Sequence, residues 1–177
     1  RVKRGALKEI KAISKLNISM QSIRQGEARG LGHAILCAEG LIGTEAFAVM
    51  LPDMLIDKDN GNAGDSLKEM RLNFERLETS SILLGKVKRA EISKYGIAQI
   101  KKISNFPGLG LIEKMIEKPS LKKAPSNLYA VGRYIFNNDF FKYLSKVKPD
   151  KSGEIQLTDA IGDYIKDGKK VSAFPLK

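Results

Sequence analysis

The stretch that organises the predicted fold is Phe47–Asp53, which reads FAVMLPD. An apolar run followed at once by a proline and an aspartate is typical of a buried parallel strand that ends in an acidic group. In open α/β sheets, ligands bind at the carboxyl ends of the strands. Asp53 is therefore a candidate functional carboxylate, although the same dipeptide also occurs where an aspartate only begins a turn.

The segments around this stretch alternate between helix and strand patterns. Apolar residues recur at helical spacing in residues 2–14, from the glycine-rich turn to about 39, and in 66–78, 139–147 and 155–166. Strand patterns occupy residues 18–23, 80–87, 97–103, 109–116, 128–137 and 171–176. The order predicts an α/β fold with a mixed, mostly parallel sheet flanked by helices, and a hairpin around Asn105–Gly108. We expect one domain over residues 1–177.

Size and composition favour an ordinary globular protein. The chain has 177 residues, of which 42% are hydrophobic and 29% are charged, enough for one core. No run is long enough for a membrane span, and no apolar segment follows the basic start, so we expect a cytoplasmic location. The single Cys37 is best interpreted as a small buried hydrophobe. Thiol catalysis with His33, four residues earlier, lacks a third group to orient the pair.

The net charge of +11 is uneven. Residues 1–30 contain eight Lys or Arg against two acidic residues, and residues 101–148 contain ten against three. Two basic blocks fit a polyphosphate ligand, a nucleic-acid surface or solvated lysines on helix faces. The aromatic content is only 7%, without tryptophan, and no nucleic-acid motif is present, so we expect no nucleic-acid partner.

A second candidate feature is the glycine-rich stretch Arg24–Ala34, RQGEARGLGHA, which precedes an apolar helix. Glycine allows a ligand or another backbone to approach closely, and a helix start offers unpaired N–H groups to phosphate. Alone, this pattern is a weak indicator.

Taken together, six motifs in order resemble the bacterial UTP–glucose-1-phosphate uridylyltransferases, a family of sugar nucleotidyltransferases. The motifs cover nearly the whole chain: RQGEARGLGHA at 24–34, LPD at 51–53, YG at 95–96, EKP at 117–119, APSNL at 124–128 with GRY at 132–134, and GEIQLTDA at 153–160. The resemblance implies a Rossmann-like nucleotide-diphospho-sugar transferase fold, with UTP and glucose 1-phosphate as partners and Mg²⁺ as cofactor.

Residue roles follow from the same resemblance. Gln25 corresponds to the amide that reads uracil, and Gly30 with Gly32 to the turn beside the base and ribose. Asp53 corresponds to the magnesium ligand, and Gly96 to a backbone contact with the sugar. The last two correspondences are Glu117, which accepts sugar hydroxyls, and Lys118, which holds the sugar phosphate. The implied catalytic residues are Asp53 and Lys118.

These residue types suit the chemistry. A sugar phosphate is already an anionic nucleophile, so the enzyme has only to position groups and neutralise charge. A hard carboxylate such as Asp53 suits Mg²⁺, which keeps several waters. An amide such as Gln25 can both donate and accept hydrogen bonds, as the edge of uracil requires.

The chain also departs from the family pattern. The family begins with a strand and a glycine-rich loop that grips the triphosphate, and it continues into a Lys-Gly…Asp-Cys-Gly segment; neither occurs in this sequence. We therefore expect an interior, truncated piece of the family's domain that is inactive alone. Exposed sheet edges and apolar surface predict a homo-oligomer.

Two other classes of function stay open at this point. Related enzymes that act on another sugar or base share the Asp and Glu-Lys-Pro features. An inactive module that binds sugar phosphate or nucleic acid is the alternative outside the enzyme class, and a steep salt dependence would identify nucleic-acid binding.

Overall fold

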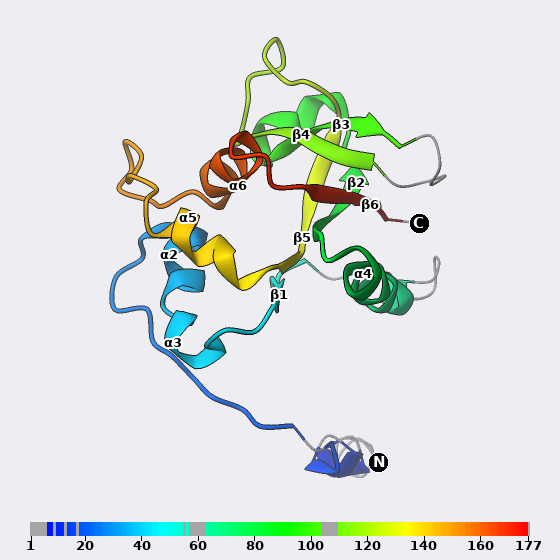
Figure 1. The fold of residues 1–177 in the computed structure, drawn as a ribbon, viewed down its shortest axis with the longest axis vertical. Coiled ribbons are helices and arrows are strands. Elements are labelled where there is room, and N and C mark those ends of the chain that lie inside the picture. The colour runs from blue at the N-terminus through cyan, green and yellow to red at the C-terminus, as the bar shows by residue number, and fades with distance from the viewer. Residues whose placement is uncertain are drawn as a thin grey trace.

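The computed structural model describes residues 7–8, 10–12, 14–16, 18–54, 56, 63–103 and 110–176. Its centre is a six-stranded sheet in the order β1-β5-β2-β6-β4-β3 (Figure 1). The strands are β1 (Phe47–Met50), β2 (Ser80–Lys86), β3 (Ile97–Lys102), β4 (Gly110–Ile116), β5 (Leu128–Phe136) and β6 (Val171–Pro175). An additional pairing of β5 with β3 joins the five strands other than β1 into a ring.

The mixed α/β sheet is confirmed, but the expected predominance of parallel pairs is wrong for the described strands. Among them, only β2 and β6 run parallel. The pairs β1–β5, β2–β5, β3–β4, β3–β5 and β4–β6 are all antiparallel. The expected hairpin is present as β3 and β4, although its turn lies outside the described residues.

The organising strand also differs from its prediction. β1 pairs with β5 alone among the described strands and lies at the sheet edge. Of its four residues only Phe47 is buried, so it is not a buried parallel strand. An edge strand can carry an apolar run because one face still packs on the core, and here Phe47 stacks on Phe141 with ring centroids 4.6 Å apart.

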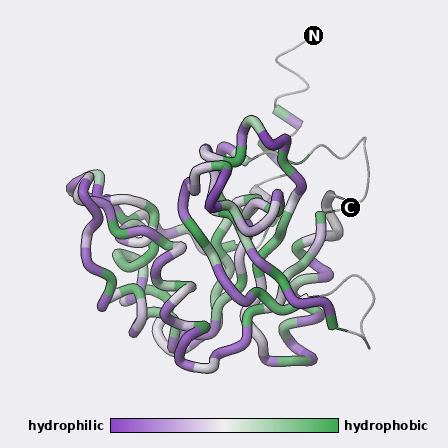
Figure 2. Tube along the Cα trace, turned by 90° about the horizontal axis from the view of Figure 1, so that it is seen from above, coloured by the Kyte–Doolittle hydropathy of each residue, from purple (hydrophilic) through white to green (hydrophobic). Residues whose placement is uncertain are grey.

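Helices cover both faces of the sheet (Figure 1). On one face α4 (Ala63–Leu77) packs on β2 and β5 around Met70, Leu83 and Phe174. The other face carries α2 (Gly30–Leu36), α5 (Phe141–Leu144) and α6 (Leu157–Lys166). In Figure 2 hydrophobic and hydrophilic residues are mixed along the trace. The inner strand β2 is buried from Ser80 to Gly85, as a strand covered on both faces requires.

The remaining helical elements are short. The apolar helix expected up to about residue 39 is broken at Cys37–Ala38, so that α2 is followed by α3 (Glu39–Ile42). The helix expected over 139–147 is a 3₁₀ turn, η2 (Asn138–Phe140), followed by α5. A second 3₁₀ turn, η1 (Arg89–Lys94), has no counterpart among the helices and strands predicted from the sequence.

The N-terminal part of the segment before α2 lies away from the body of the molecule (Figure 1). The described residues between 7 and 14 are helical, as expected, but residues 18–23, predicted as a strand, form none. Their backbone has no strand partner among the described residues, and Ile18, Met20 and Ile23 are exposed. No helix in the described ranges combines the length and hydropathy needed to cross a bilayer.

Candidate functional site

Four residues from different parts of the chain meet at the carboxyl end of β4; we call Gly96, Glu117, Lys118 and Thr158 the Glu117 corner. The Thr158 hydroxyl at the start of α6 donates a hydrogen bond of 3.2 Å to Glu117 Oε2. A Cβ placed on Gly96 would lie 2.9 Å from Thr158 Cγ2 and 3.2 Å from Glu117 Oε2. Only glycine therefore leaves the carboxylate and the hydroxyl in their places.

The Glu117 carboxyl is mostly buried, with 27% of its side chain exposed. Burial raises the pKa of Glu117 above its ordinary value and outweighs the lowering effects of the Lys118 ammonium and the Thr158 hydroxyl. The same carboxylate adds to the effect of burial in raising the pKa of Tyr134 on β5. A partly desolvated carboxylate of this kind is a strong acceptor for hydroxyl groups of a ligand.

Lys118 leaves β4 with an unusual backbone. Its φ is +41°, a left-handed conformation that is rare for a residue with a side chain. Its N–H donates to the Tyr95 carbonyl at 3.1 Å, which ties this kink to the residue before Gly96. The Lys118 ammonium lies 3.8 Å from Glu117 Oε1 and 59% of its side chain is exposed, so it is available to an anion.

A second group forms where the glycine-rich turn meets the segment before α6; we call residues 25–32 the glycine turn. The Gly32 N–H donates to the Ile155 carbonyl at 3.0 Å, and the Ile155 N–H donates to the Arg29 carbonyl at 2.9 Å. A Cβ on Gly32 would lie 2.6 Å from Ile155 O. Gly30 has a φ of +82°, and a Cβ there would lie 2.9 Å from Glu154 Cβ. Chain packing thus explains both glycines without a ligand.

The side chain of Gln25 is held inside the glycine turn. Its amide nitrogen Nε2 lies 3.2 Å from the Gly30 carbonyl oxygen and 2.8 Å from His33 Nδ1. Cys37 Sγ lies 4.0 Å from Nδ1 and 3.9 Å from Nε2 of the same ring. Because the two distances are nearly equal, the sulfur packs against the imidazole and is not directed at one nitrogen. Cys37 is only half-buried, so the expected buried position is wrong.

The segment that both groups share is folded around Asp150. Its Oδ1 accepts from the Ser152 N–H, the Ser152 hydroxyl and the Glu154 N–H, and its Oδ2 accepts from Gln156 Nε2 at 2.8 Å. These hydrogen bonds, led by that of the Ser152 hydroxyl, lower the pKa of Asp150. Residues 154 and 155 thereby reach the glycines, and Thr158 follows directly at the Glu117 corner.

Asp53 is the remaining residue that the sequence predicted for the site. It follows β1 in an exposed turn, and no described side chain forms a hydrogen bond or ion pair with it. The residue before this turn, Leu51, is held to β5, because its N–H donates to the Gly132 carbonyl at 2.9 Å. Gly132 has a φ of +61°, and a Cβ there would lie 3.0 Å from Leu51 Cβ, so β5 bends to admit this turn.

The described residues offer few protein ligands for a magnesium ion. Within the described ranges, no group of three or more His, Cys, Asp and Glu side chains is placed to hold a metal. Mg²⁺ differs from zinc in often using one or two carboxylates together with waters and substrate phosphates. An exposed carboxylate such as Asp53 fits that sparse type of site and no denser one.

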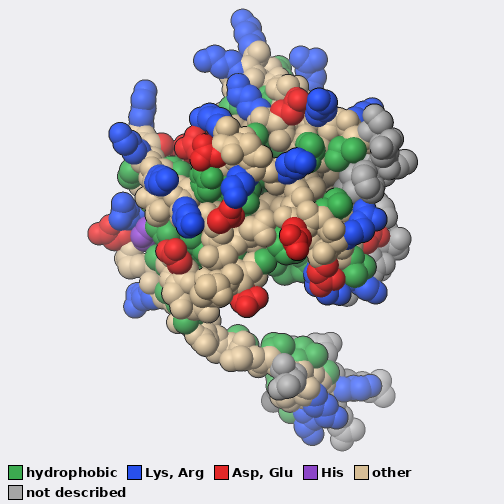
Figure 3. Space-filling view, viewed as in Figure 1, with side chains coloured by type: hydrophobic (Ala, Val, Ile, Leu, Met, Phe, Trp, Pro, Cys, Tyr) green, Lys and Arg blue, Asp and Glu red, His purple; other side chains and the backbone are tan. Residues whose placement is uncertain are grey.

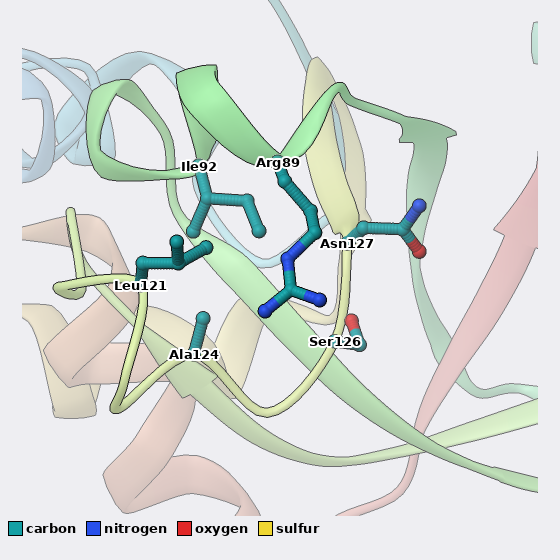
Figure 4. A pocket seen from close by; sticks show the side chains of 6 residues that line it. All are labelled: Arg89, Ile92, Leu121, Ala124, Ser126 and Asn127. Carbon is teal, nitrogen blue, oxygen red and sulfur yellow. The ribbon is translucent and has the colours of Figure 1, made fainter.

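Two cavities bounded by described residues lie near parts of the predicted site. The first, of about 310 Å³, lies between η1 and the loop after Lys118, and Figure 4 shows Arg89, Ile92, Leu121 and Ala124 in its wall. No residue that the sequence predicted for the site lines it. A larger cavity of about 720 Å³ reaches the Glu117 corner through Thr158, and its wall carries both lysines and acidic residues.

Charged side chains are mixed on the face shown in Figure 3, where acidic residues stand among the lysines and arginines. A nucleic-acid surface is typically a continuous basic patch or stripe. On this face the basic residues form none, which supports the expectation that charge is spread over solvated helix and loop surfaces.

The structure therefore unites Gly96, Glu117 and Lys118, and separately unites Gln25, Gly30 and Gly32. Sequence reasoning missed the tasks of Thr158 and Asp150. Thr158 lies inside the motif GEIQLTDA, and Asp150 lies three residues before that motif. Only the fold shows that Thr158 donates a hydrogen bond to Glu117 and that Asp150 shapes the segment that packs against Gly30 and Gly32.

Known proteins resemble this chain over nearly its whole length. A family model described as nucleotidyl transferase matches residues 3–177. The chain is 40% identical over 176 residues to the UTP–glucose-1-phosphate uridylyltransferase of Haemophilus influenzae and 38% identical over 179 residues to that of Escherichia coli K12. Those alignments cover 98% and 100% of this chain.

Solved structures show the same fold. A UDP-glucose pyrophosphorylase complexed with UDP-glucose matches 99% of this chain with a TM-score of 0.88 and 39% identity. A UTP-bound UGPase from Acinetobacter baumannii matches 99% of the chain with a TM-score of 0.80 and 32% identity.

The chain spans 59% and 58% of the length of the two curated relatives and 64% and 59% of the two solved chains. The match of the family model over nearly every residue, and the identity to these relatives, lead to one conclusion. The chain belongs to the nucleotidyl transferase family.

Proposed function

We propose that this chain forms the base- and sugar-binding part of a UTP–glucose-1-phosphate uridylyltransferase, with UTP and glucose 1-phosphate as substrates and Mg²⁺ as cofactor. The observation that carries the proposal is the shared segment 154–158, which joins the glycine turn to the Glu117 corner. A nucleoside and a sugar phosphate need two such sites side by side. The names of the relatives supply the particular base and sugar.

In the proposed reaction, a phosphate oxygen of glucose 1-phosphate attacks the α-phosphorus of UTP. A new P–O bond forms, the bond from the α-phosphorus to the bridging oxygen breaks, and pyrophosphate leaves with that electron pair. Because the nucleophile is already anionic, no general base is required. The chain contributes by positioning the reactants and neutralising their charge.

The residues divide this work between them. Glu117 accepts sugar hydroxyls, the exposed Lys118 ammonium binds the sugar phosphate, and Gly96 allows the sugar to lie against the backbone. Gln25 meets the base beside Gly30 and Gly32. Asp53 would hold the metal ion, which supplies charge neutralisation at the phosphates.

The test is an assay of the complete gene product for UDP-glucose and pyrophosphate formed in equal amounts from UTP and glucose 1-phosphate with Mg²⁺. We expect UTP and glucose 1-phosphate to be preferred over other nucleoside triphosphates and sugar 1-phosphates. Lys114→Ala, on β4 and outside the corner, serves as the matched control for Lys118→Ala. A different preferred base or sugar would overturn the proposal.

Two further properties belong to the same proposal. Self-association is supported by the position of β1 at the sheet edge and by exposed apolar side chains at Leu16, Ile18 and Met20. Sedimentation that shows a monodisperse monomer at high concentration would contradict it. A cytoplasmic location is supported by the single unpaired cysteine, Cys37.

A further inference from the structure

We propose that His33 positions Gln25 so that only the carbonyl oxygen of the Gln25 amide faces the base, which restricts the site to bases that carry an imino N–H. The inference rests on the proposed function for the identity of the ligand. The orientation of the amide, however, follows from the hydrogen bonds alone.

The first step is the orientation of the amide. A carbonyl oxygen cannot donate a hydrogen bond, so the group of Gln25 that lies 3.2 Å from the Gly30 carbonyl must be the nitrogen. The flipped amide would place two oxygens against each other. Gly30 therefore fixes which end of the amide points into the turn.

The second step concerns the histidine. The same nitrogen lies 2.8 Å from His33 Nδ1. Since the amide nitrogen carries only donors, Nδ1 must accept, and the ring proton must lie on Nε2. Gly30 and His33 together thus use both N–H groups of Gln25.

The third step is what remains for a ligand. With both N–H groups engaged, Gln25 offers only its Oε1 acceptor. Uracil and thymine carry N3–H and can donate to it. Cytosine presents an unprotonated N3 at that position, so two lone pairs would face each other, and its N4 amino group can reach Oε1 only after the base shifts. An unpaired acceptor in a partly buried site is costly. His33 thereby contributes to base selection without touching the base.

Two histidine variants separate this role from packing. Asn carries its amide near the position of the histidine Nδ1, and Gln carries its amide near that of Nε2. His33→Asn therefore keeps an acceptor for Gln25, whereas His33→Gln moves it away. Cys37→Ala removes a contact with the same ring that does not involve Gln25, and it serves as the control for loss of packing.

The kinetic experiment measures kcat/KM for UTP and for CTP, and the KM for glucose 1-phosphate, in the complete gene product. We expect His33→Gln to reduce the preference for UTP over CTP by about three- to tenfold, the worth of one hydrogen bond. The KM for glucose 1-phosphate should stay unchanged, and His33→Asn and Cys37→Ala should keep the preference. Equal preferences in His33→Gln and the parent, or equal losses in the Asn and Gln variants, would overturn the inference.

A second measurement does not depend on activity. Long-range ¹H–¹⁵N spectra of the complete gene product contain the His33 imidazole, whose signals are identified by their loss in His33→Asn. We expect the tautomer with the proton on Nε2, and a proton on Nδ1 would overturn the inference. If that tautomer is found but UTP is not a substrate, the proposed function fails while the orientation of Gln25 stands.

Discussion

Glu117 and Asp53 are both carboxylates that follow a strand, yet their surroundings are opposite. Glu117 is mostly buried, accepts a hydrogen bond from Thr158 and lies beside Gly96. Asp53 is exposed, and no side chain in the described part of the chain binds it. The chain itself arranges the first carboxylate in advance, whereas the second has no side-chain partner among the described residues.

This difference separates two ways of binding a charged ligand. A carboxylate that is held and partly desolvated selects geometry, because its acceptor positions are fixed before the ligand arrives. An exposed carboxylate selects charge, since it can adjust to a hydrated cation. Substitutions that keep shape but remove charge should therefore act differently at the two positions.

The largest effect is expected at Asp53. Asp53→Asn keeps the shape of the turn and one acceptor oxygen but removes the charge that a magnesium ion needs. We expect turnover of the complete gene product to fall by about 100-fold or more, since metal stabilisation of phosphoryl charge is worth several kcal/mol. Thermal unfolding should be unchanged. Near-normal activity across a magnesium titration would leave Asp53 as a turn residue only.

The next effect concerns the ammonium of the Glu117 corner. Lys118→Ala should reduce kcat/KM for glucose 1-phosphate about ten- to a hundredfold, which corresponds to about 1.5–3 kcal/mol for one charge-assisted contact. The affinity for UTP, measured by calorimetry, should change little, and Lys114→Ala should have no comparable effect. Similar losses for both substrates would assign Lys118 to the scaffold.

A smaller effect tests whether Glu117 is held in advance. Thr158→Val keeps the volume but removes the hydroxyl that donates to Glu117. We expect a loss of about 1 kcal/mol in kcat/KM for glucose 1-phosphate, the typical worth of one hydrogen bond. Thr158→Ser should restore the parent value. If the serine variant behaves like the valine variant, the methyl group and not the hydroxyl is responsible.

The smallest effect is on stability and its dependence on pH. Burial raises the folded-state pKa of Glu117, so the folded protein binds this proton more tightly than the unfolded chain. Stability from this group is full below the ordinary value of 4.5 and falls as the pH rises through the raised value. Glu117→Gln removes that fall, so the variant should gain stability relative to the parent between pH 4.5 and neutral pH.

Urea unfolding at both ends of that range measures the change. Glu113→Gln, on β4 and exposed, controls for the loss of one negative charge. An equal response to pH in the two variants would show that net charge, and not burial of Glu117, is the cause.

The sequence predicted most element positions because hydrophobic periodicity is local. The strand patterns at 80–87 and 128–137 match β2 and β5 within one residue at each end. Pairing direction was wrong because no local pattern reports which strand lies alongside. For the same reason, residues 18–23 carry a strand pattern without becoming one: a strand exists only where a neighbour accepts its hydrogen bonds.

Three residues of the candidate site were singled out by the resemblance of the motifs to a known family. Gly96 comes from the motif at 95–96, Glu117 and Lys118 come from the motif at 117–119, and the fold brings them together. Thr158, Asp150 and His33 were not assigned tasks because their importance lies in which group they bond. That information exists only in three dimensions, and no spacing in the sequence contains it.

The contact of Gly32 with Ile155 has an evolutionary consequence. A Cβ on Gly32 would collide with the backbone oxygen of Ile155, whereas a Cβ on Gly85 would meet the side chains of Tyr129 and Val131. Smaller residues at 129 and 131 could relieve a substitution at Gly85, but no exchange at 155 can remove a carbonyl. A genetic screen for second-site suppressors should therefore recover them for Gly85→Ala and not for Gly32→Ala. Gly85 can therefore change during evolution together with residues 129 and 131, whereas Gly32 has to remain glycine.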